Sequence, residues 1–426
     1  MPHTKHLHPW QVITGGICGL VLTIGLARFA YTPLLPSLQL QTGLTDAAAG
    51  GLAAINYAGY MSGALAATWI DDVRWRHWLY SAGLWMALLT VAAMALTTWM
   101  PAWALIRYIG GLCGATGMLL GSGLVLGWLI RQGRRPELGL YFIGLGLGIV
   151  VSAVGAWALA QWWPTWSDQW LAFAALGLVF FVPAWKWRPP VPPHVAPAHA
   201  AASGSLGSRR WTWTMVTSYF AAGWGFVISA TFPVAIVERE PALAGVGPLA
   251  WAMVTSYFAA GWGFVISATF TVAIVEREPA LAGVGPLAWA MVGLAAMPAV
   301  FIWDLVARRV GEKRALLLAF GLQTVSVILP AISGDLWAAL AGAVGYGATF
   351  IGIVSLTLAL AGRRAPSNPG KAMAKLTLSY GVAQILAPVI AGHMAQTTGT
   401  FKGALWLTAA VMAVGMALLA TLPKDE

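Results

Sequence analysis

The chain has 426 residues, of which 59% are hydrophobic and only 9% are charged, whereas about a quarter of the residues of a soluble globular domain are charged. This composition, with a mean hydropathy of +0.75, excludes an ordinary soluble protein. The formal net charge of +10 does not indicate a nucleic-acid-binding protein, because the basic residues lie between apolar segments rather than in one patch.

Six apolar segments occupy the first part of the chain, each close to or above the roughly 20 residues that a membrane-spanning helix requires. The first is too long for the apolar core of a cleaved signal peptide. The segments cover approximately residues 11–36, 48–70, 77–98, 102–130, 137–160 and 169–187. They predict an N-terminal six-helix bundle at residues 1–187 of an all-α polytopic membrane protein.

Residues 188–211 are rich in proline, alanine, glycine and serine, which predicts a cytoplasmic linker. The rest of the chain, residues 212–426, is predicted to form a C-terminal bundle. It contains seven apolar segments, at approximately residues 213–237, 251–275, 286–307, 314–333, 336–361, 373–394 and 402–421.

The seventh segment comes from a tandem duplication of 38 residues. Residues 253–290 repeat residues 215–252 with one change, Thr271 in place of Pro233. Solenoid repeats have at least about three diverged units, so a near-perfect single copy indicates a recent duplication or a sequence-assembly error. Without one copy the two halves have similar lengths, which predicts two bundles of six helices plus one extra apolar segment.

The positive charges predict how many segments cross the membrane, because lysine and arginine favour cytoplasmic loops. With the N-terminus inside, Arg74 and Arg131 of the first half lie inside. Arg308 and Arg364 of the second half also lie inside only if a single copy crosses. We therefore predict twelve spans in a bacterial inner membrane, both termini cytoplasmic, and a surplus copy that is re-entrant, peripheral or misfolded.

Two arginines lie within predicted spans, where each costs about 2.5–3.5 kcal/mol on insertion scales. Pro36 and Trp103 mark the outer ends of these spans. At a rise of 1.5 Å per residue, Arg28 lies about 12 Å below Pro36 and Arg107 about 6 Å below Trp103, so both arginines are predicted in the outer half of the membrane. Neither has a counter-charge in its own segment. They predict a cationic patch that holds an anionic group; the alternative is snorkelling or pairing with a backbone carbonyl.

Signals for other chemistry are missing from the sequence. No Asp or Glu lies clearly within a span, so a carboxylate proton relay has no evident carrier. Cys18 and Cys113 have neither metal-ligand spacing nor an obvious disulfide framework. No P-loop and no H-E-x-x-H or G-x-S-x-G motif occurs. We therefore expect no enzymatic activity, no cofactor and no metal.

Several motifs resemble the major facilitator superfamily (MFS). R-Y-I-G-G, from Arg107, resembles its R-x-x-Q-G motif with Gly110 replacing Gln, and I-W-D-L-V-A-R-R-V-G-E-K-R, from Ile302, is similar to its helix 8–9 loop signature. The bacterial YbfB/YjiJ-type branch is resembled by R-F-A-Y-T-P-L-L-P from Arg28, N-Y-A-G-Y-M-S-G-A from Asn56 and L-T-L-S-Y-G-V-A-Q-I-L-A-P from Leu376.

The resemblance implies a twelve-helix carrier whose helices 1, 4, 7 and 10 line a central cavity, flanked by helices 2 and 11. The substrate-binding candidates are then Arg28, Arg107, Tyr31, Asn56, Tyr60, Tyr219, Trp224, Tyr257, Trp262, Tyr346, Tyr380 and Gln384, with Thr32, Thr116 and Thr349. For each uncharged residue, an interhelical hydrogen bond of ~0.6 kcal/mol is an equally good role. Asp304, Arg308 and Arg309 are expected to latch the bundles on the cytoplasmic side, besides setting orientation.

The sequence therefore favours a secondary active or facilitative transporter that moves a small organic solute by alternating access. The two arginines make an anion the favoured class of solute. We expect a functional monomer whose partners are the lipid bilayer and a small-molecule substrate, with no nucleic acid. The alternatives are an efflux carrier for hydrophobic or cationic compounds, and a non-transporting receptor or assembly protein, which would bind ligand without flux.

Overall fold

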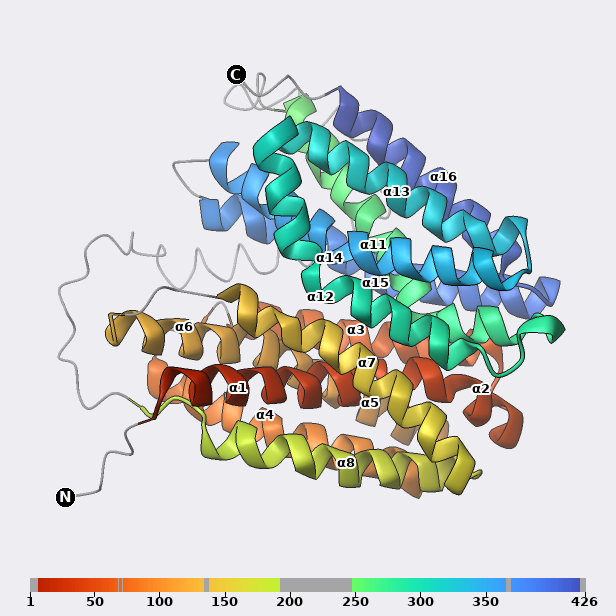
Figure 1. The fold of residues 1–426 in the computed structure, drawn as a ribbon, viewed down its shortest axis with the longest axis horizontal. Coiled ribbons are helices and arrows are strands. Elements are labelled where there is room, and N and C mark those ends of the chain that lie inside the picture. Colours follow the sequence, from red (N-terminus) through yellow and green to blue (C-terminus); the bar gives the residue numbers. More distant parts are fainter. Residues whose placement is uncertain are drawn as a thin grey trace.

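A computed structural model describes residues 7–67, 69–70, 72–133, 138–191, 247–364 and 369–421, and within these ranges the regular structure is helical without strands. Figure 1 shows two layers of long helices, α1–α8 in red to yellow and α11–α16 in green to blue. The all-α polytopic fold with two bundles is confirmed.

The N-terminal bundle consists of six long helical rods, several of which change helix type along their length. Their bounds are α1 Pro9–Leu20, η1 Val21–Phe29 and α2 Tyr31–Thr42; α3 Asp46–Ala67; α4 Val73–Ala93 with η2 Met94–Leu96; α5 Met100–Ala115, η3 Thr116–Gly121 and α6 Ser122–Arg131; α7 Leu138–Trp162; and α8 Trp166–Lys186.

The described part of the C-terminal bundle also consists of six long helices. Their bounds are α11 Gly247–Glu276, α12 Gly285–Val310, α13 Glu312–Ile332, α14 Leu336–Arg364, α15 Pro369–Thr398 and α16 Lys402–Ala420, with the short η4 Pro279–Leu281 after α11. Among the described residues, ten rods are long and apolar enough to cross a membrane. The other two, α3 and α15, pack against each other between the bundles, which explains why they can be less apolar.

The second copy of the duplicated segment supplies most of α11 and the start of α12. The apolar segment predicted at residues 213–237, most of the linker predicted at 188–211, and Tyr219 and Trp224 lie outside the described residues. Taken alone, the described part already contains six rods in each half, as the predicted twelve-span plan requires.

Deleting one copy of the duplicated segment tests whether the second copy alone supplies α11 and the start of α12. Deleting residues 215–252 is expected to leave the yield and thermal stability of the folded protein nearly unchanged, because α11 from Met253 onward belongs to the second copy. Deleting residues 253–290 instead produces the same chain with a proline at the position of Thr271. That proline removes a helical hydrogen bond, at a cost of about 3 kcal/mol in a helix interior.

The two deletion variants therefore form a matched pair, to be compared by size-exclusion chromatography and thermal unfolding in detergent. We expect the proline-containing variant to unfold at the lower temperature. Loss of folded protein in the first variant would contradict the assignment, since it would show that the fold requires the first copy.

Successive rods alternate in direction, so Arg131 and Arg308, which lie at or near the ends of rods in the two halves, are at the same end of the molecule. Asp46 at the start of α3 pairs with Arg277 just after α11, which fixes the relative orientation of the bundles. Arg131 at the end of α6 and Arg308 near the end of α12 then lie at the opposite end. We call these the Asp46 end and the basic end.

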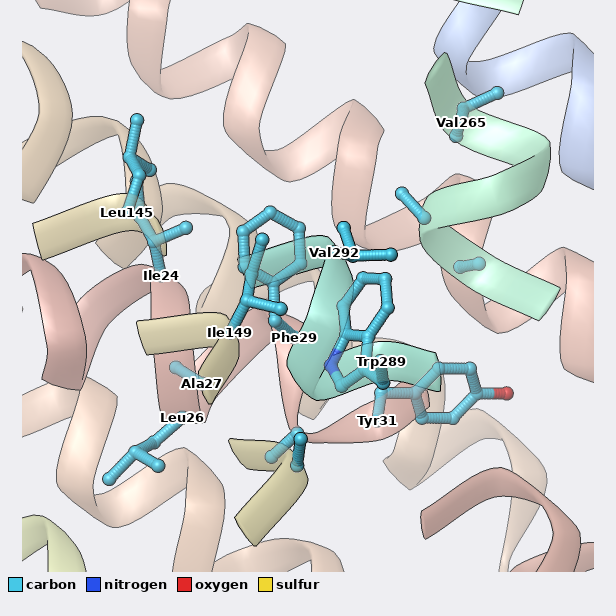
Figure 2. Close-up of a cluster of buried hydrophobic side chains, with 14 of the residues drawn as sticks. Ile24, Leu26, Ala27, Phe29, Tyr31, Leu145, Ile149, Val265, Trp289 and Val292 are labelled. Atoms are coloured by element: carbon cyan, nitrogen blue, oxygen red, sulfur yellow. The ribbon is translucent and has the colours of Figure 1, made fainter. Parts of the chain in front are cut away.

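A continuous apolar core joins the two bundles. Figure 2 shows side chains of the first rod, α7, α11 and α12 gathered in one cluster. Within it, the rings of Phe29 and Trp289 meet edge to face with centroids 5.9 Å apart. The indole N–H of Trp289 donates to Ser152 Oγ of α7 at 3.0 Å. The two halves therefore contact each other directly through this core.

Candidate functional site

Arg28 lies in η1, a π-helical stretch in the middle of the first rod. π-Helical stretches are rare in proteins, and many of those that do occur lie at functional sites. The rod continues to Thr42 rather than ending near Pro36, so Arg28 lies about 21 Å from its end at 1.5 Å per residue. Arg28 therefore lies close to the middle of the rod, and its depth of about 12 Å below the outer membrane surface stays a prediction.

The Arg28 guanidinium is surrounded by aromatic rings. Its central carbon lies 4.1 Å from the ring centroid of Tyr57, 4.9 Å from that of Tyr60 and 5.6 Å from that of Phe29. Only 7% of the residue is exposed, and its Nε has no hydrogen-bond partner. Ring faces attract the cation, but they leave N–H donors unsatisfied.

Arg107 lies in α5 and has a similar environment. Its guanidinium lies 4.3 Å from the ring centroid of Tyr31, and Nη1 donates to the carbonyl oxygen of Ala27 at 3.3 Å. The residue is 3% exposed and its Nε has no partner. A guanidinium carries five N–H donors. Pairing with a backbone carbonyl, the alternative to anion binding, therefore satisfies only one of these donors here.

Asn56 connects the second rod to this pair. Its side-chain N–H donates to the backbone oxygen of Arg107 at 2.7 Å, while its own Oδ1 is buried without a partner. In the described parts of the chain, the ion pairs join Asp46 to Arg277, Asp304 to Arg308 and Glu278 to Lys402. None of these carboxylates faces Arg28 or Arg107, so no described residue balances the charge of these two buried cations.

A small cavity of about 10 Å³ lies at this position, large enough for about one water molecule. Both bundles contribute to its wall. The lining residues are Arg28, Phe29, Tyr31, Thr32, Ala53, Tyr57, Arg107, Ala268 and Thr269. Thr32 donates across the bundles to the carbonyl oxygen of Ala268 at 2.5 Å. The arginine pair therefore faces the boundary that a relative movement of the two bundles would open.

A cluster of aromatic rings in the C-terminal bundle faces the arginine pair. Phe264 of α11 lies at its centre, with ring centroids 5.2 Å from Phe350, 6.0 Å from Tyr380 and 6.5 Å from Tyr346. Tyr57 of the N-terminal bundle meets Phe264 edge-on at 6.3 Å. Tyr57 thus contacts both Arg28 and the aromatic cluster.

The structure brings most of the predicted site residues to this boundary. Arg28, Arg107, Tyr31, Asn56 and Tyr60 lie together in the first bundle, while Tyr346 and Tyr380 contact Phe264, and Tyr257 packs on Tyr380 with centroids 4.7 Å apart. Trp262 instead packs on Phe258 of its own helix. Gln384 is buried in α15, and Thr116 begins η3.

Sequence reasoning missed Tyr57, Phe264 and Phe350. Helical spacing could have identified two of them, because residues three or seven positions apart share a helix face. Tyr57 precedes Tyr60 by three residues, and Phe264 follows Tyr257 by seven. Apolar rings in an apolar segment otherwise carry no functional signal.

The predicted cytoplasmic latch remains a prediction. Asp304 and Arg308 form an ion pair of 2.8 Å along α12, with side chains 60% and 75% exposed. Such an exposed pair contributes little to stability, and it lies within one bundle. Arg309 is likewise exposed near the end of α12.

The ion pair that joins the bundles lies at the Asp46 end. Arg277 Nη2 and Asp46 Oδ2 are 2.5 Å apart, and Gln39 donates to the other carboxylate oxygen of Asp46 at 2.8 Å. The Arg277 guanidinium also lies 4.5 Å from the ring centroid of Phe401. Sequence reasoning could not find this pair, because its members are 231 residues apart and each lies near a loop.

Glycines allow the bundles to approach closely near the same end. A Cβ atom added at Gly50 of α3 would lie 2.1 Å from the carbonyl oxygen of Pro388 of α15, and one at Gly392 would lie 2.3 Å from that of Asp46. Small residues permit such backbone contacts between membrane helices. The Asp46 end is therefore closed by direct contact of α3 with α15.

Comparisons with known proteins agree with this architecture. The model of a family described as "Uncharacterised MFS-type transporter YbfB" matches residues 20–255 and 246–420, two segments that overlap in the duplicated region. A search of curated protein sequences gives no match.

Among solved structures, the nucleoside transporter NupG aligns with a TM-score of 0.71 and 14% identity, covering 98% of this chain and 99% of that one. A mutant of NupG aligns with a TM-score of 0.73 at the same identity, covering 97% and 100% of the two chains. A D-xylose–proton symporter aligns with a TM-score of 0.70 and 14% identity, covering 97% and 98%. At this identity the likeness shows the fold alone.

Proposed function

Because the chain belongs to the family of YbfB-type MFS transporters, and is thus a multi-pass membrane transporter, we propose that it is a secondary carrier for a small organic anion. The carrier would act as a monomer in the bacterial inner membrane. Its basic end would face the cytoplasm, where lysine and arginine accumulate, and the chain termini would lie on that side.

The observation that carries this proposal is the pair of buried arginines. Arg28 and Arg107 are 7% and 3% exposed, and neither forms an ion pair in the part of the chain that the structure describes. Buried charges in proteins are paired, and charges within a bilayer mark substrate pathways. A bound anion would supply the missing partner, which a cation or a neutral solute would not.

The contacts between the bundles support a mechanism of alternating access. The Asp46–Arg277 pair and the glycine contact of α3 with α15 close one end, which would be the periplasmic end in the proposed orientation. Rocking of the bundles would break these contacts and expose the arginine pair to the periplasm. The Thr32–Ala268 hydrogen bond would break in the same movement.

A ligand panel tests the proposed class of solute. The purified full-length chain in detergent would be heated with monocarboxylates, dicarboxylates, organic amines and neutral sugars, each at the same concentration. A ligand that binds only the folded protein stabilises it by about 2.7 kcal/mol at 100 times its dissociation constant. We expect only anions to raise the unfolding temperature.

The same panel distinguishes the alternatives. Stabilisation by organic amines, with none by carboxylates, would contradict anion transport and favour efflux of cationic compounds. Binding of an anion without counterflow in proteoliposomes would favour a receptor.

A further inference from the structure

We propose that the transported solute is an aromatic carboxylate, with its carboxylate held by Arg28 and Arg107 and its ring stacked among Tyr57, Phe264 and Tyr380. This inference rests on the proposed anion transport and assigns the solute to one chemical class. The juxtaposition of a paired guanidinium site with an aromatic cluster across the bundle boundary carries it.

The charged half of the site matches a planar anion. Both arginines have unpaired Nε–H groups, and a guanidinium binds a carboxylate through two parallel N–H···O bonds. The ring of Tyr57 lies 4.1 Å from Arg28, and the ring of Tyr31 lies 4.3 Å from Arg107. These flat rings cover the faces of the cations and leave their N–H edges as the groups able to bind a ligand.

The aromatic half of the site matches a planar ring. The rings of Tyr380, Tyr346 and Phe350 lie at only 27°, 29° and 35° to that of Phe264. Tyr346 and Phe350 are also stacked on each other at 20°. Rings with a shared orientation present parallel faces, and another flat ring can join them by offset stacking. A puckered aliphatic ring of the same size lacks the flat π face that this stacking requires.

Tyr57 connects the two halves within the length of a small ligand. Its ring contacts Arg28 on one side, and its centroid lies 6.3 Å from that of Phe264 on the other. A molecule with a carboxylate attached directly to a ring would therefore reach the guanidinium and the stacked rings together. An aliphatic carboxylate of similar length would use only the charged half.

The closed conformation explains why the cavity at this position is small. It holds about 10 Å³, because Phe264 fills the space between Tyr57 and the C-terminal rings. The cavity walls come from both bundles, so their separation would enlarge it. We infer that, when the bundles part, a substrate ring enters between Tyr57 and Phe264 and stacks on the ring of Phe264.

Equilibrium binding to the full-length chain in nanodiscs tests the inference at pH 7.5, where simple carboxylic acids are ionised. The probes are benzoate, cyclohexanecarboxylate, which has the same charge and ring size, and benzamide, which has the ring without the charge. We expect benzoate to bind at least about tenfold more tightly than cyclohexanecarboxylate, and benzamide not to bind. This comparison uses only the unmodified protein.

A matched pair of variants locates the preference. Phe264→Leu is expected to abolish most of the difference between benzoate and cyclohexanecarboxylate while both still bind. Phe258→Leu, on the same helix but outside the cluster around Phe264, should retain the full preference. A preference that survives Phe264→Leu unchanged would overturn the assigned stacking position.

The outcomes separate this inference from the proposed function. Equal affinity for benzoate and cyclohexanecarboxylate would overturn the aromatic class and leave anion transport intact. Binding of neither carboxylate, with binding of amines in the same assay, would overturn both.

Discussion

Replacing Arg107 with alanine is expected to lower the initial rate of anion uptake at least about thirtyfold. Truncating one member of a buried, hydrogen-bonded charge pair costs about 2–5 kcal/mol, and each 1.4 kcal/mol corresponds to a factor of ten. Arg28→Ala should act in the same direction. Arg107→Lys keeps the charge but loses the planar pair of donors, so we expect an intermediate rate.

Counterflow in proteoliposomes measures this effect, with Arg131→Ala as the matched control. Arg131 is an exposed arginine at the end of α6, far along the same rod. In the absence of ligand, Arg107→Ala should retain or increase thermal stability, because it removes a buried charge without a carboxylate partner. Wild-type uptake in this variant would exclude Arg107 from the mechanism, and loss of folded protein would indicate a structural role instead.

Replacing Gly50 with leucine is expected to reduce uptake to the background rate while leaving anion binding measurable. Even the first side-chain atom at this position would lie 2.1 Å from the carbonyl oxygen of Pro388. The side chain would therefore hold α3 away from α15 and prevent closure of the Asp46 end. A carrier that cannot close one end cannot complete a transport cycle.

Gly51 provides the control, because nothing lies within 4 Å of a Cβ atom added there. Gly51→Leu should transport at the wild-type rate. In a background without Cys18 and Cys113, a cysteine introduced in place of Thr269, which lines the central cavity, should react with an impermeant maleimide from outside in the Gly50→Leu variant. Equal labelling of the variant and its parent would show that the Asp46 end still closes.

The sequence was sufficient to predict the class of fold because the bilayer imposes a strong constraint. A spanning segment must satisfy its backbone hydrogen bonds internally and expose apolar side chains, so segments of about 20 apolar residues are visible without any tertiary information. The predicted bounds of the individual spanning segments were less accurate than the predicted class of fold. The first rod extends to Thr42 because Pro36 lies within its helix instead of ending it, so Arg28 lies farther from the end of its rod than the sequence indicated.

The residues of the candidate site also fall into two groups, those that the sequence identified and those that it missed. Arg28 and Arg107 were identifiable from the sequence because a charge within an apolar segment has a large energetic cost and is therefore conspicuous. Phe264 and Tyr57 were missed, because an aromatic residue in an apolar segment has no energetic cost; only their helical spacing from Tyr257 and Tyr60 pointed to them. The Asp46–Arg277 pair depends on a contact between residues 231 positions apart, which no local pattern records.

The sequence by itself thus determined a helical membrane carrier built on twelve spans, with two charges that need an explanation. Only the tertiary structure decided that those charges lie against aromatic rings at the boundary between the bundles, that the second copy forms most of α11, and that the bundles close at the Asp46 end. The physical reason is one of range. Hydrophobicity and charge act through the solvent around each segment, whereas stacking, ion pairing and glycine contacts require atoms from distant segments to meet within a few ångströms.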